Sequence, residues 1–324
     1  MKIVMLGNTG VGKTTYMASL FGIMQQRVEG FSLKTTNPSD RSHLLDLGNK
    51  ISSGNYPGGT SARAEYDFIL QHQARDIFPF SWADYRGGAI SEKQNSEQAS
   101  SLVRDLKEAD GIMMLCDCQA LAHGNTKANE IRRMTTLVSQ ALRDIERPIS
   151  LAVILTKTDI VGSFQEKIFS PFQGLIDVIN ASEWVMGAFI PVACGTKFIN
   201  VPIPLFFALY STVLYQALVA QHMAQEYYNR AQQWQQKSQG VEGFFRWVGD
   251  KWNGNTTDEE LALANMAAAV EAYQKLESIK DPVLALGKYL EKIPVIQQGK
   301  TLNDYAEASA KLKIYYRINS SDWF

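Results

Sequence analysis

The chain has 324 residues, of which 45% are hydrophobic and 20% are charged, and its formal net charge is -1. This composition excludes a disordered chain, and the near-neutral charge gives no support for nonspecific nucleic-acid binding, so no nucleic-acid partner is expected. Three cysteines are too few for a disulfide framework, which favours a reduced, cytoplasmic compartment.

A glycine-rich loop follows the first apolar run, Ile3–Leu6, and precedes a predicted amphipathic helix, Thr15–Gln26. The loop fits the pattern G-x-x-x-x-G-K-[ST], in which backbone N–H groups and a helix N-terminus bind phosphate. In this pattern Lys13 reaches the β- and γ-phosphates and acts in catalysis, and the Thr14 hydroxyl holds Mg²⁺. A chance glycine-rich turn is the alternative, which the strand–loop–helix context disfavours. The expected nucleotide-binding residues are Gly7, Asn8, Thr9, Gly10, Val11, Gly12, Lys13, Thr14 and Thr15.

Strands and helices alternate along the rest of the first two thirds of the chain. The predicted strands are Gly30–Thr36, Ala64–Gln71, Ile77–Ala83, Gly111–Leu115, Ile149–Leu155 and Ala188–Val192. The predicted helices are Pro38–Ser52, Glu97–Glu108, Asn125–Ile145, Ser163–Asn180 and a helix from Leu205 that continues to Gln236. This alternation predicts an α/β fold of the P-loop NTPase type, with a mainly parallel sheet covered on both faces. Ligands of such sheets bind at the carboxyl ends of the strands.

The composition changes near residue 221, where glutamine becomes frequent and clear strand signals end. We therefore predict a nucleotide-binding domain over residues 1–220 and an α-helical extension over residues 221–324. Residues 201–225 carry no formal charge, but two prolines and several polar side chains favour a core helix over a membrane span. The aromatic stretch Phe244–Trp252 is interpreted as packing of the extension; peripheral contact with a membrane or a partner is the less favoured alternative.

A second candidate element is the D-x-x-G sequence Asp84–Gly87, which follows a predicted strand. A carboxylate at this place can hold Mg²⁺, and the N–H of Gly87 can contact the γ-phosphate and move when it leaves. A solvated aspartate at a strand end is the alternative interpretation.

A third element, Thr156–Asp159, also ends a predicted strand. The Asp159 carboxylate can accept two N–H bonds from guanine, a donor pair that adenine lacks. Lys157 can lay its aliphatic stem over the base, and the backbone N–H groups near Ala193 and Cys194 can reach the base oxygen. An ordinary polar turn is the alternative for Thr156–Asp159.

The order of these three motifs resembles that of translation-factor-like and Ras-like GTPases over about residues 1–220. The segments 12–16, 56–60 and 84–88 resemble more narrowly the bacterial double-GTPase group. This resemblance implies GTP/GDP and Mg²⁺ as ligands, a protein effector or a companion GTPase as partner, and a role in bacterial defence or conflict systems.

The resemblance also assigns roles to residues in the two loops. Thr60 matches the threonine that binds Mg²⁺ and the γ-phosphate, and its spacing from Asp84 is similar to that of the family. Thr156 replaces the usual Asn, which predicts weaker guanine binding. Gly88 replaces the water-orienting Gln of Ras-like members, which predicts slow hydrolysis without a partner. Arg86 and Arg63 are candidates to stabilise the transferring phosphate; a structural role is the alternative for each.

Three functions are therefore compatible with the sequence. The first is a GTP-hydrolysing switch whose loops are ordered by GTP and Mg²⁺ and released on hydrolysis. The second is a GTP-binding scaffold without significant hydrolysis. The third is an ATPase, which Asp159 disfavours.

Overall fold

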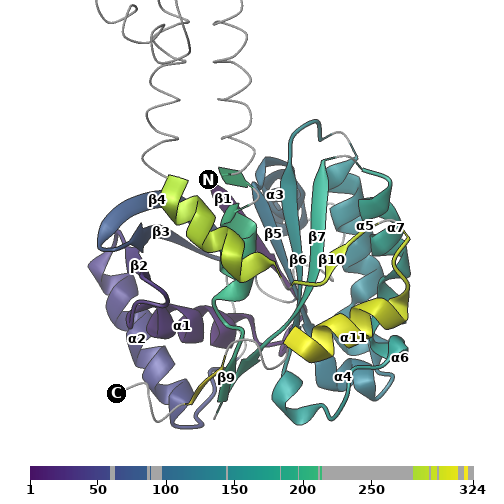
Figure 1. Cartoon of the computed structure of the whole chain (residues 1–324), viewed down its shortest axis with the longest axis horizontal. Coiled ribbons are helices and arrows are strands. Elements are labelled where there is room, and N and C mark those ends of the chain that lie inside the picture. Colours follow the sequence, from purple (N-terminus) through teal and green to yellow (C-terminus); the bar gives the residue numbers. More distant parts are fainter. Residues whose placement is uncertain are drawn as a thin grey trace, which may run out of the picture. The chain divides into compact units, whose positions relative to one another are not determined.

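The computed structural model describes residues 1–58, 63–85, 88, 97–143, 145–182, 184–195, 197–210, 212–213, 280–291, 293–297, 299–312 and 317–319 (Figure 1). The chain divides into two units, one formed by Met1–Thr212 with Leu286–Phe324 and the other by Val213–Ala285. The first unit contains all of the described strands. The predicted boundary at residue 220 and the aromatic stretch Phe244–Trp252 lie outside the described residues.

The first unit is built on an eight-stranded sheet with the strand order β10-β7-β6-β5-β1-β4-β3-β2. Strands β7, β6, β5, β1 and β4 are parallel, whereas β3, β2 and β10 run antiparallel to their neighbours. The bounds are β1 Lys2–Leu6, β2 Phe31–Thr35, β3 Ala64–His72, β4 Arg75–Asp84, β5 Gly111–Asp117, β6 Ile149–Thr156, β7 Val185–Pro191 and β10 Val295–Ile296. The α/β fold with a mainly parallel sheet is thus confirmed.

Helices cover both faces of this sheet, because alternate residues of its central strands are buried on opposite sides. On one face, Val4 and Leu6 of β1 share a core cluster with residues of α3, α5, α6, α7 and α11. On the other face, α1 packs with α2, and helical residues 203–210 lie against β5 and β6, where Ser150 Oγ donates to the carbonyl of Ala208. The helix bounds are α1 Lys13–Met24, α2 Pro38–Ser52, α3 Glu97–Glu108, α4 Cys118–Ala122, α5 Ile131–Leu142, α6 Glu166–Phe169, α7 Gln173–Asn180 and α11 Leu302–Leu312.

Three predicted helices differ from the observed ones. The predicted helix Ser163–Asn180 begins only at Glu166 and is divided into α6 and α7 by a 3₁₀ turn at Ser170–Phe172, which contains a proline. Helix α1 is buried nearly all round and is not amphipathic, because it lies between the sheet and α2. The predicted helix Asn125–Ile145 begins only at Ile131, since Thr126–Asn129 form a 3₁₀ turn and Glu130 takes a left-handed conformation with φ 49°. Within the described part of the chain, no helix has the length and apolar character needed to cross a membrane.

Part of the predicted helical extension, Leu286–Phe324, belongs instead to the first unit. Strand β10 pairs with β7, and Tyr305 of α11 packs its ring on Phe189 of β7 at a centroid distance of 5.4 Å. A second, three-stranded sheet has the order β11-β9-β8, with β8 Ala193–Cys194, β9 Lys197–Ile199 and β11 Arg317–Asn319. The end of the chain therefore returns to the first unit at two places.

We expect Tyr305→Ala to lower the free energy of unfolding of this unit by about 3–5 kcal/mol, because Tyr305 is only 1% exposed and its loss leaves a cavity. Urea denaturation measures the change. Lys311→Ala, at an exposed position of the same helix, is the control and should change stability by less than about 0.5 kcal/mol. Equal stability of Tyr305→Ala and the wild type would contradict the packing of the tail on β7.

Candidate functional site

The phosphate loop connects the end of β1 to the first turn of α1. Gly12 is the N-cap of α1 and has φ 95° and ψ 23°, a left-handed conformation that glycine adopts without strain. No described side chain caps this helix, so its first backbone N–H groups keep their capacity to bind an anion. The local backbone structure is therefore compatible with phosphate binding at this loop.

Two buried charges lie beside this loop. The ammonium of Lys13, a residue only 6% exposed, donates to the carbonyl oxygens of Gly7 at 2.8 Å and Asn8 at 3.2 Å, and burial lowers its pKa. Asp84, at the end of β4 and 3% exposed, lies in register with Met5 of β1. Burial raises the pKa of Asp84 to about 6, against the opposing effect of the Lys13 charge. Its Oδ1 atom has no hydrogen-bond partner among the described residues, so this carboxylate is able to accept a cation.

The third motif lies at the carboxyl end of β6. The Thr156 hydroxyl lies 2.8 Å from the carbonyl oxygen of Val11 and 3.1 Å from that of Cys116. A threonine here thus holds the phosphate loop to β5 and β6 through its short side chain. Lys157 takes a left-handed backbone conformation with φ 57°, and Asp159 lies in the 3₁₀ turn Thr158–Ile160 that follows.

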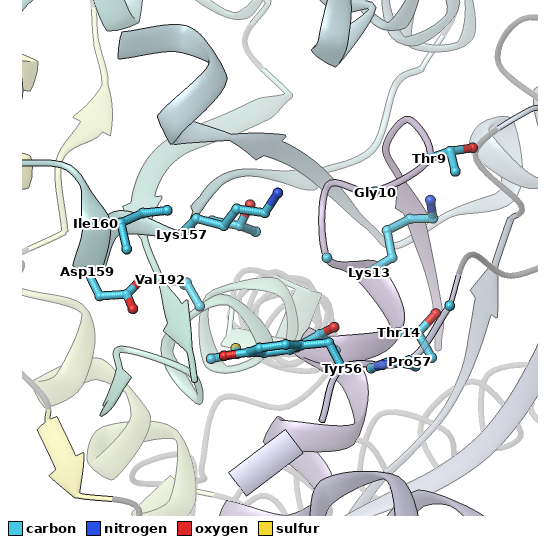
Figure 2. A pocket seen from close by; sticks show the side chains of 15 residues that line it. Thr9, Gly10, Lys13, Thr14, Tyr56, Pro57, Lys157, Asp159, Ile160 and Val192 are labelled. Carbon is cyan, nitrogen blue, oxygen red and sulfur yellow. The ribbon is translucent and has the colours of Figure 1, made fainter. Parts of the chain in front are cut away.

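A single cavity of about 420 Å³ joins the phosphate loop to the third motif (Figure 2). The sequence-predicted residues that line it are Thr9, Gly10, Gly12, Lys13, Thr14, Thr15, Thr156, Lys157, Asp159 and Cys194. Among the other predicted residues, Gly7, Asn8, Val11, Asp84 and Ala193 lie outside its lining, although Gly7 and Asn8 contact Lys13. Thr60, Arg86 and Gly87 lie outside the described residues.

The cavity also has a wall that the sequence analysis did not assign, formed by Tyr56, Pro57 and Gly58. The Tyr56 side chain extends from the phosphate-loop end toward Asp159, on the side opposite Lys157 (Figure 2). Its hydroxyl approaches Gly195 so closely that a Cβ atom there would lie 2.8 Å from it. Burial, Asp159 and Cys194 together raise the pKa of Tyr56. Residues 56–60 resemble a family motif, but they lie in a long loop whose sequence does not indicate where its side chains point.

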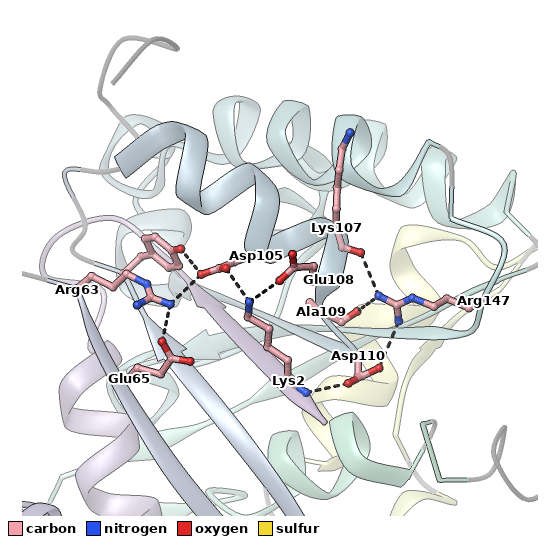
Figure 3. Close-up of polar contacts among 10 residues, drawn as sticks. Lys2, Arg63, Glu65, Asp105, Lys107, Glu108, Ala109, Asp110 and Arg147 are labelled. Carbon is pink, nitrogen blue, oxygen red and sulfur yellow. Dashed lines mark hydrogen bonds and ion pairs between the residues drawn. The ribbon is translucent and has the colours of Figure 1, made fainter. Parts of the chain in front are cut away.

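Arg63, a candidate for phosphate contact, is bound elsewhere. Its guanidinium forms ion pairs with Glu65 at 2.7 Å and with Asp105 of α3 at 3.0 Å (Figure 3). It also lies over the Tyr85 ring at 5.3 Å, and the Tyr85 hydroxyl donates to Asp105. Arg63 does not line the cavity, so the structural interpretation of this residue is favoured.

Comparison with known protein families finds a match over slightly less than half of the chain. Residues 4–154 match the model of a family described as Double-GTPase 1. No curated protein matches the sequence.

Two solved structures of the S. cerevisiae Ski7 GTPase-like domain are similar to part of the chain. One is bound to GDP and inorganic phosphate, with 16% identity, and the other is bound to GTP, with 15% identity. Each match covers 60% of this chain and 43% of that chain with a TM-score of 0.38. The chain thus spans less than half of the length of these structures.

The family match covers the strand, loop and helix that carry the phosphate loop, together with Asp84 and most of β6. These elements occur in the order and at the sheet edge expected from the motifs. Residues 4–154 therefore match the double-GTPase family, and this match supports the assignment of these residues as a P-loop GTPase domain.

Proposed function

We propose that this protein is a GTP-binding switch that hydrolyses GTP to GDP and phosphate. The observation that carries the proposal is the continuous cavity with the phosphate loop at one end and Asp159 at the other. Its volume of about 420 Å³ is within the range of small-molecule sites. A guanine nucleotide placed in it has its phosphates at the N-terminus of α1 and its base at Asp159.

The base end is proposed to recognise guanine by polar pairing. Asp159 accepts the two N–H groups of the guanine edge, and the base lies between the Lys157 stem and the Tyr56 ring. The backbone N–H groups of Ala193 and Cys194 are proposed to donate to the base oxygen. Adenine leaves the Asp159 carboxylate without these donors, which disfavours the ATPase alternative.

The residues at the phosphate end suit a divalent cation. Asp84 offers a buried carboxylate oxygen that has no hydrogen-bond partner among the described residues, and Thr14 lines the cavity. Thr14, Asp84 and Thr60 are proposed to hold Mg²⁺. When bound, Mg²⁺ neutralises charge on the β- and γ-phosphates.

The described residues of the chain position the substrate more than they activate water. Lys13 orients the β- and γ-phosphates, and the first turn of α1 stabilises their negative charge. Gly88 has no side chain to orient a water molecule, and Arg63 is held by Asp105 and Glu65. We therefore propose slow intrinsic hydrolysis, with Gly87 and Arg86 as further catalytic candidates and a protein effector or companion GTPase as activator. We further propose a cytoplasmic role in a bacterial defence or conflict system, as the resemblance of the motifs to the double-GTPase group implies.

A GTP-binding scaffold is the second candidate. The same two observations, the glycine at position 88 and the engaged Arg63, favour it over a fast enzyme. It would bind GTP as a structural cofactor and release negligible phosphate.

Nucleotide binding and phosphate release, measured with GTP and with ATP, separate these candidates. We expect GTP to bind at least about 100-fold more tightly than ATP, since a polar site rejects a base that leaves it unpaired. Lys13→Ala should abolish tight binding, and Lys50→Ala, at an exposed residue of α2, is the control. Binding without turnover favours the scaffold, and a preference for ATP overturns the role of Asp159.

The raised pKa of Asp84 leads to a prediction about how the stability of the nucleotide-free protein depends on pH. A carboxyl group whose pKa is about 6 when folded and 3.8 when unfolded destabilises the nucleotide-free protein as pH rises from 4 to 6. At pH 8, Asp84→Asn should therefore stabilise the nucleotide-free protein by up to about 3 kcal/mol and remove the Mg²⁺ dependence of GTP binding.

Thermal melts without nucleotide at pH 4.5 and pH 8 measure this effect. The difference in stability between Asp84→Asn and the wild type should be small at pH 4.5, where Asp84 is protonated when folded. Asp46→Asn, an exposed aspartate, is the matched control. If Asp84→Asn is less stable than the wild type at pH 8, the buried Asp84 carboxylate does not destabilise the nucleotide-free protein, and the prediction is wrong.

A further inference from the structure

The side chain of Asp117, at the carboxyl end of β5, lies beside the proposed base site. Asp117 pairs in register with Thr156 of β6, so it neighbours the third motif across the sheet. Its Oδ1 accepts from the N–H of Ala120 at 2.9 Å and caps α4, and its Oδ2 accepts from the ammonium of Lys157 at 2.5 Å. The Asp117 side chain is 15% exposed and that of Lys157 is 38% exposed.

This ion pair determines where the Lys157 stem lies. A lysine at a surface ordinarily extends its ammonium into water. Here the ammonium is bound at Asp117, and the stem lines the cavity, on the side opposite Tyr56 (Figure 2). Lys157 has a left-handed backbone conformation with φ 57°, which sets the direction in which its side chain leaves the turn.

The backbone of Asp117 is held in place by the side-chain amide of Asn129, which is fully buried. The Asn129 side chain accepts from the backbone N–H of Asp117 at 2.6 Å and donates to its carbonyl oxygen at 3.1 Å. The preceding residue, Ala128, accepts at its carbonyl from the side-chain amide of Asn8 at 2.9 Å. The turn Thr126–Asn129 therefore contacts both the phosphate loop and the residue that binds Lys157.

We infer that Asp117, held by Asn129, is a positioning residue of the nucleotide site that directs the stem of Lys157 over the base. The turn Thr126–Asn129 connects this arrangement to the phosphate loop through Asn8. The inference rests on the proposed function, because it assigns Asp117 a role in guanine nucleotide binding. A purely structural ion pair would hold α4 and β6 together without affecting that binding.

A double-mutant cycle on the affinity for GDP tests the inference. The four proteins are the wild type, Asp117→Asn, Lys157→Ala and the double variant, measured by calorimetry with GDP. Asp117→Asn keeps an oxygen for the N–H of Ala120 and removes only the charge that binds Lys157. We expect it to weaken GDP binding about tenfold in the wild-type background and to have no further effect once Lys157 is alanine, because it acts through Lys157.

Controls separate this role from a loss of stability. Asp46→Asn, which removes an exposed i,i+4 ion pair with Lys50, should leave GDP affinity within about twofold of the wild type. Thermal melts without nucleotide establish that Asp117→Asn is folded at the temperature of the binding measurement. If Asp117→Asn fails to fold, Lys157→Met supplies the test, since it keeps an apolar stem but loses the ammonium and should also weaken GDP binding.

The outcomes distinguish the inference from the proposed function. Wild-type protein that binds no guanine nucleotide overturns both. Wild-type protein that binds GDP, with unchanged affinity in Asp117→Asn or with additive losses in the double variant, overturns only the positioning role. Unchanged affinity in Lys157→Met does the same.

Discussion

The hydroxyl of Thr156 lies between the carbonyl oxygens of Val11 and Cys116, and this contact joins three segments that the chain brings together from far apart. Because β1, β5 and β6 are parallel, their carboxyl ends meet at one edge of the sheet, and the polar groups beyond them need partners there. The Thr156 hydroxyl shares its one proton between these two carbonyl oxygens and connects the phosphate loop to the segment that carries Asp159. The cavity exists because the two loops are held at this separation.

Two buried charges lie beside the cavity, and each compensates the other only in part. Lys13 and Asp84 are both buried, and each loses favourable hydration that only partly returns through their mutual attraction. Such an arrangement is unfavourable for an empty protein and favourable for one that binds a cation and an anionic ligand together. The neighbouring network of Lys2, Arg63 and Asp105 differs in this respect, because its charges are paired within the protein.

The sequence was sufficient to predict the parts of the fold whose signals are local. The phosphate loop, the strands from β1 to β7 and the helices α1 to α3 lie close to their predicted positions because apolar runs, turn residues and caps mark their ends. Strands β8, β9 and β10 have two or three residues and no periodicity, so only their partners in the sheet identify them. The pairing of Asp117 with Lys157, and the place of Tyr56 opposite them, depend on register between distant segments. Asp117 ends a predicted strand at the sheet edge where ligands bind, and this position is a signal that could have identified it. Its pairing with Lys157 could not be predicted from the sequence.

The two residues of β10 have a consequence for how this domain behaves in a crowded solution. Without them, β7 would be the outermost strand on that side, with a row of backbone donors and acceptors open to any extended segment of another molecule. By hydrogen-bonding to Gly187 and Ala188, the returning chain blocks such intermolecular β-pairing where the parallel part of the sheet ends. Strand β10 thus shields the sheet edge from intermolecular pairing and also places Ile296 in the hydrophobic core.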